Sequence, residues 1–193
     1  MSNNLVVQAF AFAYQAHRQT TRKATNIPYI THPLAVTINL LRSSILTEDL
    51  LAAALLHDVV EDEDVTYDQL IHRFGERVSS LVRAVSEPKS LADQHTDRRK
   101  TWKIRKEHTI DSLIGASDEV KILSCADKVA NLADMVRDHK QFGETLWSRF
   151  NAPKNEQRWY YHSLLEVYKS GTNNIEKSAL YIEFCSLVNQ IFA

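Results

Sequence analysis

The sequence predicts an all-α protein, a helical bundle of about eight to ten helices. The chain has only four Gly and four Pro among its 193 residues, which leaves few residues for tight hairpin turns. Apolar residues recur at helical spacing, and no segment shows the strict alternation of a half-buried strand. At this length, with 44% hydrophobic residues, the chain is expected to fold as one domain over residues 1–193, in which 140–193 are C-terminal helices that complete it.

Capping residues place the first helices. Asn3 or Asn4 is expected to cap a helix that ends near His17. A polar connector follows, and Pro33 then suits the first turn of a helix that carries the apolar stripe Leu34, Ile38 and Leu41.

The most apolar stretch of the chain is LLAAALLHDVVED, residues 50–62. Thr47 is expected to cap it, with acidic residues in the first turn. Seven apolar residues run without a break, which predicts a central helix that is buried nearly all round.

The rest of the chain also divides into helices. Thr66 and Gln69 form a capping-box pattern for a short helix through Phe74, and Gly75 ends it before a further helix. Residues 86–97 are expected to form a loop and 98–113 a basic helix. Residues 118–138 form a predicted helix, residues 140–157 are irregular, and two helices follow at 158–169 and 174–192. The helix at 118–138 is expected to bury Val120, Leu123, Ala126, Ala130 and Ala133.

Composition excludes several classes of protein. The net charge of −1 argues against a general nucleic-acid-binding protein. No apolar run approaches 18 residues and no signal peptide opens the chain, so we expect a cytoplasmic protein with no membrane partner. Cys125 and Cys185 lie in apolar contexts typical of reduced core cysteines. The oligomeric state stays open.

Four ionisable residues end the central apolar stretch: His57, Asp58, Glu61 and Asp62. Burying such groups costs free energy unless something compensates their charge. His57 and Glu61 are four residues apart, as are Asp58 and Asp62, so each pair shares one row of a helix. A metal ion with an acid/base group beside it accounts for this pattern.

Two residues elsewhere extend the set. His32 stands directly before Pro33 at a helix start, and Asp127 lies in a mostly apolar helix. Alone, each has a simpler explanation, as a structural histidine or a buried ion pair. Together with His57 and Asp58 they form a set of two imidazoles and two carboxylates, which suits Mn, Fe or Zn and leaves positions open for water and substrate.

This order of residues, H…HD…D on separate helices, resembles the HD phosphohydrolase superfamily. Further segments resemble its (p)ppGpp hydrolase branch, which comprises the hydrolase domains of RelA/SpoT proteins and the small alarmone hydrolases. The similarity covers residues 9–132, roughly two-thirds of the chain. The segments are HRQTTRK (17–23), PYITHP (28–33), AALLHDVVED (53–62), FGERVSSLV (74–82) and ADKVANL (126–132).

The resemblance implies a role for each matching residue. His32, His57, Asp58 and Asp127 would hold Mn²⁺, and Glu61 and Asp62 would position and activate the attacking water. The residues expected at the nucleotide are Arg22, which would stack on the base, with Lys23, Asn131, Tyr160 and Lys103. The implied substrate is a purine nucleotide that carries a 3′-pyrophosphate.

The chain departs from the family pattern at two places. Residues 24–27, Ala-Thr-Asn-Ile, replace a segment in which the family usually has Gly, so the choice between guanine and adenine stays open. Trp102 stands where the family has a lysine, which makes Lys103 the nearest candidate for a phosphate contact. No synthetase domain follows, so we expect a hydrolase without synthetase activity.

The basic helix carries six positive charges within residues 98–106. Most are expected on a solvated face, with one or two turned inward to phosphate groups.

We therefore predict a metal-dependent hydrolase that removes the 3′-pyrophosphate of (p)ppGpp or (p)ppApp. The alternatives are another HD-class nucleotide phosphohydrolase, a non-catalytic nucleotide sensor on the same scaffold, and a helical interaction scaffold without a ligand.

Overall fold

The computed structural model describes residues 4–23, 25–87 and 99–193, and the side chain of Asp62 also lies outside this part. Within these ranges the fold is all-α, as predicted, and its only β-type pairing is an isolated bridge between Thr21 and Pro28. The helices are α1 (Leu5–Ala16), α2 (Thr31–Leu40), α3 (Glu48–Leu56), α4 (Val59–Asp62), α5 (Tyr67–Val85), α6 (Trp102–Ile114), α7 (Asp118–Phe142), η2 (Gly143–Arg149), α8 (Lys154–Lys169), η3 (Ile175–Lys177) and α9 (Ala179–Phe192).

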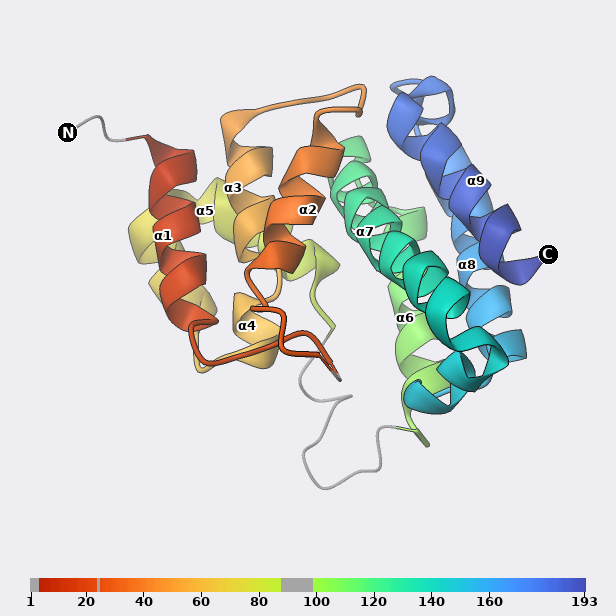
Figure 1. Ribbon diagram of the computed structural model, residues 1–193. Coiled ribbons are helices and arrows are strands. Elements are labelled where there is room, and N and C mark those ends of the chain that lie inside the picture. The colour runs from red at the N-terminus through yellow and green to blue at the C-terminus, as the bar shows by residue number, and fades with distance from the viewer. Residues whose placement is uncertain (1–3, 24, 88–98) are drawn as a thin grey trace.

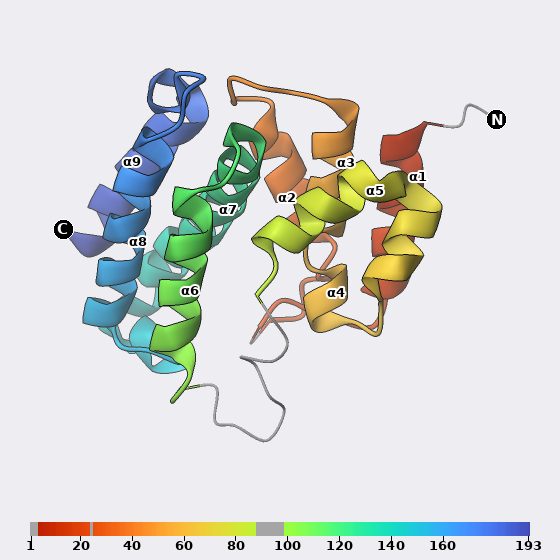
Figure 2. The same ribbon diagram turned by 180° about the vertical axis from the view of Figure 1, so that it is seen from behind.

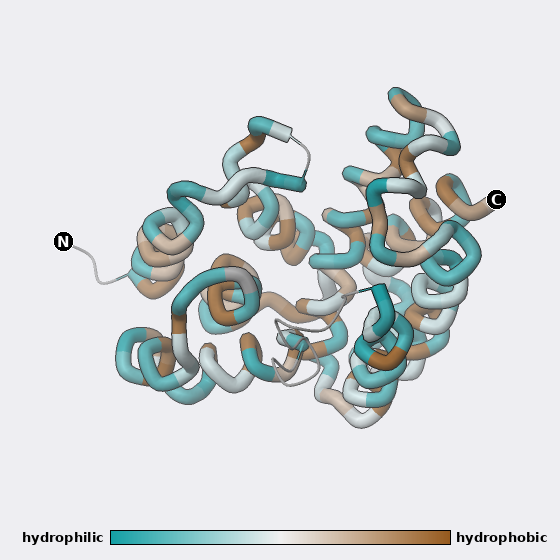
Figure 3. Tube along the Cα trace, turned by 90° about the horizontal axis from the view of Figure 1, so that it is seen from below, coloured by the Kyte–Doolittle hydropathy of each residue, from teal (hydrophilic) through white to brown (hydrophobic). Residues whose placement is uncertain are grey.

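Helix α3 lies at the centre of the N-terminal half, against α1, α2, α5 and α7. Its apolar run is buried, as predicted, because neighbouring helices cover it on several sides. The long helix α7 joins the two halves, since it packs on α2 and also on α9 (Figures 1 and 2). Most helices carry both hydrophilic and hydrophobic residues (Figure 3), as amphipathic helices around a common core do.

The central helix is shorter than predicted. It ends at Leu56, and a separate turn, α4, begins at Val59. Nδ1 of the His57 ring forms a hydrogen bond with the carbonyl oxygen of Ala54 at 2.7 Å. Because a side chain then competes with the backbone for this acceptor, the helix is interrupted at His57 and Asp58. Each predicted pair of residues four apart therefore spans this break, with His57 and Asp58 in it and the second member of each pair in α4.

The apolar stripe predicted on the second helix faces outward. Leu34, Ile38 and Leu41 are 36%, 55% and 64% exposed, whereas Val36 and Leu40 are fully buried. The side of α2 that carries Val36 and Leu40 packs on α3 and α7, and the predicted stripe lies on the opposite side of the helix. On α7, the prediction was right for Val120 and the other buried positions but wrong for Ala133, which is exposed.

Several boundaries follow the predicted signals. Asn4 caps α1, Thr66 and Gln69 form the capping box of α5, and Gly75 kinks that helix with a φ of 83°. Such a positive φ is open to glycine because it has no Cβ. Most of the loop predicted at 86–97 lies outside the described residues. No helix in the described part of the chain is long and apolar enough to cross a membrane.

Candidate metal centre and adjoining cavities

His32 enters the site from the first turn of α2. Its side chain is 3% exposed, and its Nε2 lies 3.1 Å from Oδ1 of Asp127 and 3.5 Å from Oδ2 of Asp58. The imidazole thus lies between two carboxylates that come from different elements, the α3–α4 turn and α7.

His57 reaches the same point from the turn after α3. Its Nδ1 lies 2.7 Å from the carbonyl of Ala54, and a carbonyl can only accept, so Nδ1 carries the hydrogen. The other nitrogen, Nε2, lies 3.1 Å from Oδ2 of Asp58 and 3.7 Å from Oδ1 of Asp127. It is buried and makes no hydrogen bond of good geometry with the residues that the structure describes. The ring is therefore held in the orientation that a metal-binding histidine needs.

Each carboxylate is itself held by a neighbouring side chain. The hydroxyl of Tyr29 donates to Oδ2 of Asp58 at 2.7 Å. On α7, the amide of Asn131 donates to Oδ1 of Asp127 at 2.7 Å, and Lys128 pairs with its other oxygen. Such outer hydrogen bonds fix the position of metal-binding carboxylates.

The electrostatics of the cluster favour an added positive charge. Burial by itself would lower the pKa of His57, but Asp58 and Asp127 outweigh it and raise the pKa well above its usual value. Burial opposes ionisation of Asp58 too, yet His57 lowers the pKa of that carboxyl well below its usual range. A proton on Nε2 or a metal ion can supply this positive charge, so metal binding is expected to release protons.

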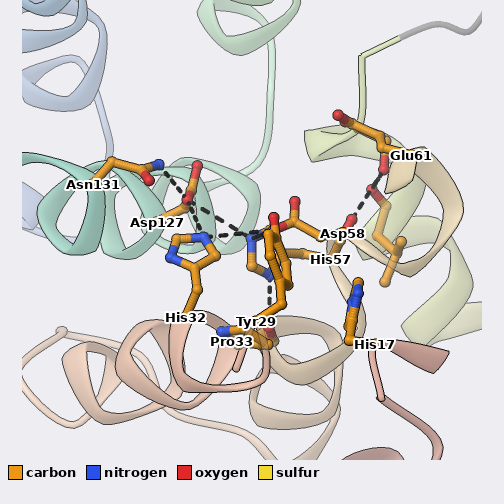
Figure 4. Close-up of polar contacts among 12 residues, drawn as sticks. His17, Tyr29, His32, Pro33, His57, Asp58, Glu61, Asp127 and Asn131 are labelled. Atoms are coloured by element: carbon orange, nitrogen blue, oxygen red, sulfur yellow. Dashed lines mark hydrogen bonds and ion pairs between the residues drawn. The ribbon is translucent and has the colours of Figure 1, made fainter. Parts of the chain in front are cut away.

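Three of the four predicted ligands lie close enough together to share a divalent ion, and the fourth adjoins them. Donor atoms of His32, His57 and Asp58 all lie within 4.8 Å of one another, and Asp127 contacts both imidazoles. Ligand atoms about 2.0–2.2 Å from a shared ion span comparable distances. The four side chains point toward one another, with Asn131 behind Asp127 (Figure 4).

Two adjoining cavities meet beside this cluster. The first has a volume of about 690 Å³ and contains the four candidate ligands together with Glu61, Arg105 and Lys106. The second, of about 830 Å³, extends under the connector that carries Arg22 and Lys23. Volumes of this size accommodate a nucleotide. The residues that line both cavities are Arg22, Tyr29, His32, Lys106, Lys128, Asn131 and Tyr160.

Comparison with known proteins identifies the scaffold. The family model described as an HD domain matches residues 9–157. The chain belongs to the HD-domain family. A guanosine-3′,5′-bis(diphosphate) 3′-pyrophosphohydrolase of Xenopus tropicalis, MESH1, is 33% identical over 180 residues, which are 91% of this chain and 90% of its own length. The match confirms the resemblance to the (p)ppGpp hydrolase branch.

Two solved structures share the fold of this HD domain. A Listeria monocytogenes protein, lmo0812, matches with a TM-score of 0.73 and 32% identity over 88% of this chain and all of its own. A metazoan ortholog of SpoT that hydrolyses ppGpp matches with a TM-score of 0.74 and 27% identity over 98% of this chain and 97% of its own.

Two predicted nucleotide-binding residues lie on the connector of this HD domain. The guanidinium of Arg22 donates through Nη2 to Asp134 at 2.8 Å and to Asn131 at 3.4 Å, and its Cζ lies 5.5 Å from the centre of the Tyr29 ring. Burial would lower the pKa of Arg22, but Asp134 outweighs it and raises the pKa. Lys23 lies at the second cavity, where its Nζ donates to the carbonyl of Arg149 at 2.7 Å.

Tyr160 lies between the two cavities, on α8. The residue is 2% exposed, and its hydroxyl is buried without a hydrogen-bond partner in the described part of the protein. A buried hydroxyl normally has a partner, so this one is available to a ligand.

The cations of α6 that face the cavities are Arg105 and Lys106 and not Lys103, the residue that was expected. Lys103 lines neither cavity, because its Nζ pairs with Glu156 at 2.9 Å and lies over the ring of Trp159. Arg105 and Lys106 do line the first cavity, where both pair with Glu87. The charge pattern of α6 places cations on several faces, so sequence spacing did not single these two out.

Glu61 lines the first cavity on the far side of Asp58 from the histidine pair (Figure 4). Its Oε1 accepts a hydrogen bond from the backbone N–H of Glu87. The side chain of Asp62 lies outside the described part of the structure, so its expected role stays a prediction.

Sequence reasoning assigned no role to three residues of the site: Tyr29, Lys128 and Glu87. Tyr29 and Lys128 lie inside the segments PYITHP and ADKVANL, which resemble the family, so their positions in the sequence could have indicated a role. Burial alone would lower the pKa of Lys128, but Asp127 outweighs it and raises the pKa well above its usual value. Glu87 lay in an expected polar loop, and nothing in its local sequence marked it.

Proposed function

We propose that this chain is a metal-dependent phosphohydrolase that removes the 3′-pyrophosphate from (p)ppGpp or the related (p)ppApp. The observation that carries the proposal is the convergence of four metal-ligand side chains at a cavity that cationic side chains line. The names of the MESH1 relative and of the SpoT ortholog, which act on ppGpp, support the same substrate.

For the cofactor we propose Mn²⁺, held by His32, His57, Asp58 and Asp127. The orphaned Nε2 of His57 and the mixed nitrogen and oxygen donors support a transition-metal ion. When bound, such an ion supplies a Lewis acid that polarises a phosphoryl oxygen and lowers the pKa of water.

The protein groups account for the rest of the chemistry. Glu61 takes a proton from the attacking water as its oxygen bonds to phosphorus, and the bond between phosphorus and the 3′ oxygen breaks. The proton that Glu61 has taken passes to the 3′ oxygen, which becomes a hydroxyl, and the pyrophosphate leaves with the oxygen of the water. Lys106 and Arg105 neutralise charge on the pyrophosphate, since both line the cavity of the metal cluster.

The nucleoside end would extend into the second cavity. The planar guanidinium of Arg22 is suited to stack on a purine, and Asn131 and Tyr160 offer polar groups to the sugar and phosphates. Lys23 adds a cation at the rim. The four C-terminal elements from η2 onward complete the same domain in this proposal, because α8 and α9 pack on α7.

We also place this activity in a reducing compartment, the cytoplasm. Cys125 and Cys185 are both free thiols, and Cys125 is buried, as expected where disulfides do not persist.

The test is to incubate the protein with Mn²⁺ and ppGpp, ppApp, GTP and AMP, and to identify the products by chromatography. We expect release of pyrophosphate from ppGpp or ppApp, with GDP or ADP as the second product. Phosphate release from AMP alone would instead favour a nucleoside monophosphatase. Tight binding of ppGpp without any product would favour a nucleotide sensor.

A further inference from the structure

The two cations that face the metal cluster are already paired inside the protein. Glu87 directly follows the C-cap of α5. Its carboxylate accepts from Lys106 Nζ through Oε1 at 2.7 Å and from Arg105 Nη1 through Oε2. The side chains of Glu87, Lys106 and Arg105 are 16%, 19% and 6% exposed. The two ion pairs are therefore largely shielded from water, and salt weakens them less than it weakens surface pairs. One carboxylate thus engages both cations.

This carboxylate lies in the reaction cavity rather than on the outer surface. Glu87, Arg105, Lys106 and Glu61 all line the cavity of the metal cluster. The backbone N–H of Glu87 also donates to Glu61, which brings the residue next to the proposed base. Burial would raise the pKa of Glu87, but Lys106 and Arg105 outweigh it and lower the pKa to about 2. The group is therefore an anion at any working pH.

A polyphosphate that enters this cavity meets the same two cations. It cannot approach both of them while Glu87 keeps its contacts, because like charges brought together in a desolvated site repel. We propose that Glu87 is an internal competitor for the substrate phosphates: its carboxylate holds Arg105 and Lys106 in the free protein, and the pyrophosphate of the substrate displaces it. This inference rests on the proposed function, in which the substrate carries a pyrophosphate.

The rival role for Glu87 is to orient the two cations so that they bind phosphate better. The two roles predict opposite effects of removing the charge. Glu87→Gln keeps the shape of the side chain and the backbone N–H that Glu61 uses. If Glu87 competes, the variant binds pyrophosphate more tightly. If it orients, the variant binds pyrophosphate more weakly.

The experiment is a calorimetric titration of inorganic pyrophosphate into wild type and Glu87→Gln at a fixed Mn²⁺ concentration. We expect about a tenfold lower Kd in the variant, since loss of a like charge in a partly buried site is worth roughly this factor. With ppGpp as substrate, KM should fall while kcat stays within a few-fold. An unchanged or higher Kd for pyrophosphate overturns the proposal.

Two controls complete the design. Glu156 pairs with Lys103, which lies on α6 like Arg105 and Lys106, and this pair lines neither cavity. Glu156→Gln should therefore leave the Kd for pyrophosphate unchanged. Glu87→Asp keeps the charge on a shorter side chain and should give an intermediate Kd, which provides a second reading if the Gln variant is poorly folded. If wild type hydrolyses no ppGpp, the proposed function fails, but the pyrophosphate titration still decides the role of Glu87.

Discussion

Asn131 donates from Nδ2 to Oδ1 of Asp127 at 2.7 Å, and so holds a proposed metal ligand from one turn further along α7. The same amide accepts from Arg22 through its oxygen at 3.4 Å. The orientation of the amide is therefore set from both sides, and the metal cluster and the second cavity are joined through one side chain.

Loss of this amide should weaken metal binding. Asn131→Ala removes the donor that orients Asp127, and loss of such a partner typically lowers metal affinity by about 10- to 100-fold. A Mn²⁺ titration followed by calorimetry measures the change. Asn173→Ala, which removes an amide that donates to Asp118 outside the metal cluster, is the matched control. Equal Mn²⁺ affinity in wild type and Asn131→Ala would show that Asp127 is positioned without the amide.

Removal of a ligand should abolish metal binding and activity together. Asp127→Asn keeps the size of the side chain but removes the charge that balances the histidines. We expect no Mn²⁺ in the purified variant, by elemental analysis, and no hydrolysis of ppGpp. Asp111→Asn, an exposed carboxylate on α6, should behave as wild type. Full Mn²⁺ occupancy in Asp127→Asn would remove this residue from the ligand set.

Metal removal should lower the melting temperature of the wild type. An ion that binds only the folded state stabilises it by about 2.7 kcal/mol at a hundred times its Kd. Differential scanning calorimetry with Mn²⁺ and with EDTA measures this shift, and Asp127→Asn should show none. A wild-type Tm that is independent of Mn²⁺ would argue against a site occupied in the folded protein.

Arg22 should act on substrate binding more than on the chemical step. Stacking on a base is similar in the ground state and the transition state, so Arg22→Ala should raise KM more than it lowers kcat. Arg22→Lys keeps the charge but lacks the planar group, and should recover little of the loss. Steady-state kinetics with ppGpp separates the two constants. Normal KM with a much lower kcat would assign Arg22 to the chemistry instead.

Glu61 should act on the chemistry and not on binding. Glu61→Gln can still accept the hydrogen bond from Glu87 but cannot take a proton, and loss of a general base costs about 10²–10⁴-fold in rate. We expect Mn²⁺ and nucleotide to bind nearly normally, with turnover at least about a hundredfold slower. Glu63→Gln, two residues on and paired with His17, is the control. Turnover of Glu61→Gln within a few-fold of wild type would leave Asp62 as the local candidate.

The sequence by itself determined the fold class and predicted the four proposed metal ligands. Helical periodicity and caps such as Asn4 and Thr66 are local properties, so the helices themselves and the starts of α1 and α5 could be predicted. Asp127 and His32 could be found because a charged or polar group in an apolar setting requires a partner wherever the chain places it.

Only the tertiary structure decided which faces meet. The outward stripe of α2 and the inward turn of Lys106 in place of Lys103 each depend on packing between segments distant in sequence. Glu87 is the clearest case, because its two partners lie 18 and 19 residues away on another helix. Periodicity shows which residues of a helix share a face, but the free energy of packing against other helices decides what that face contacts.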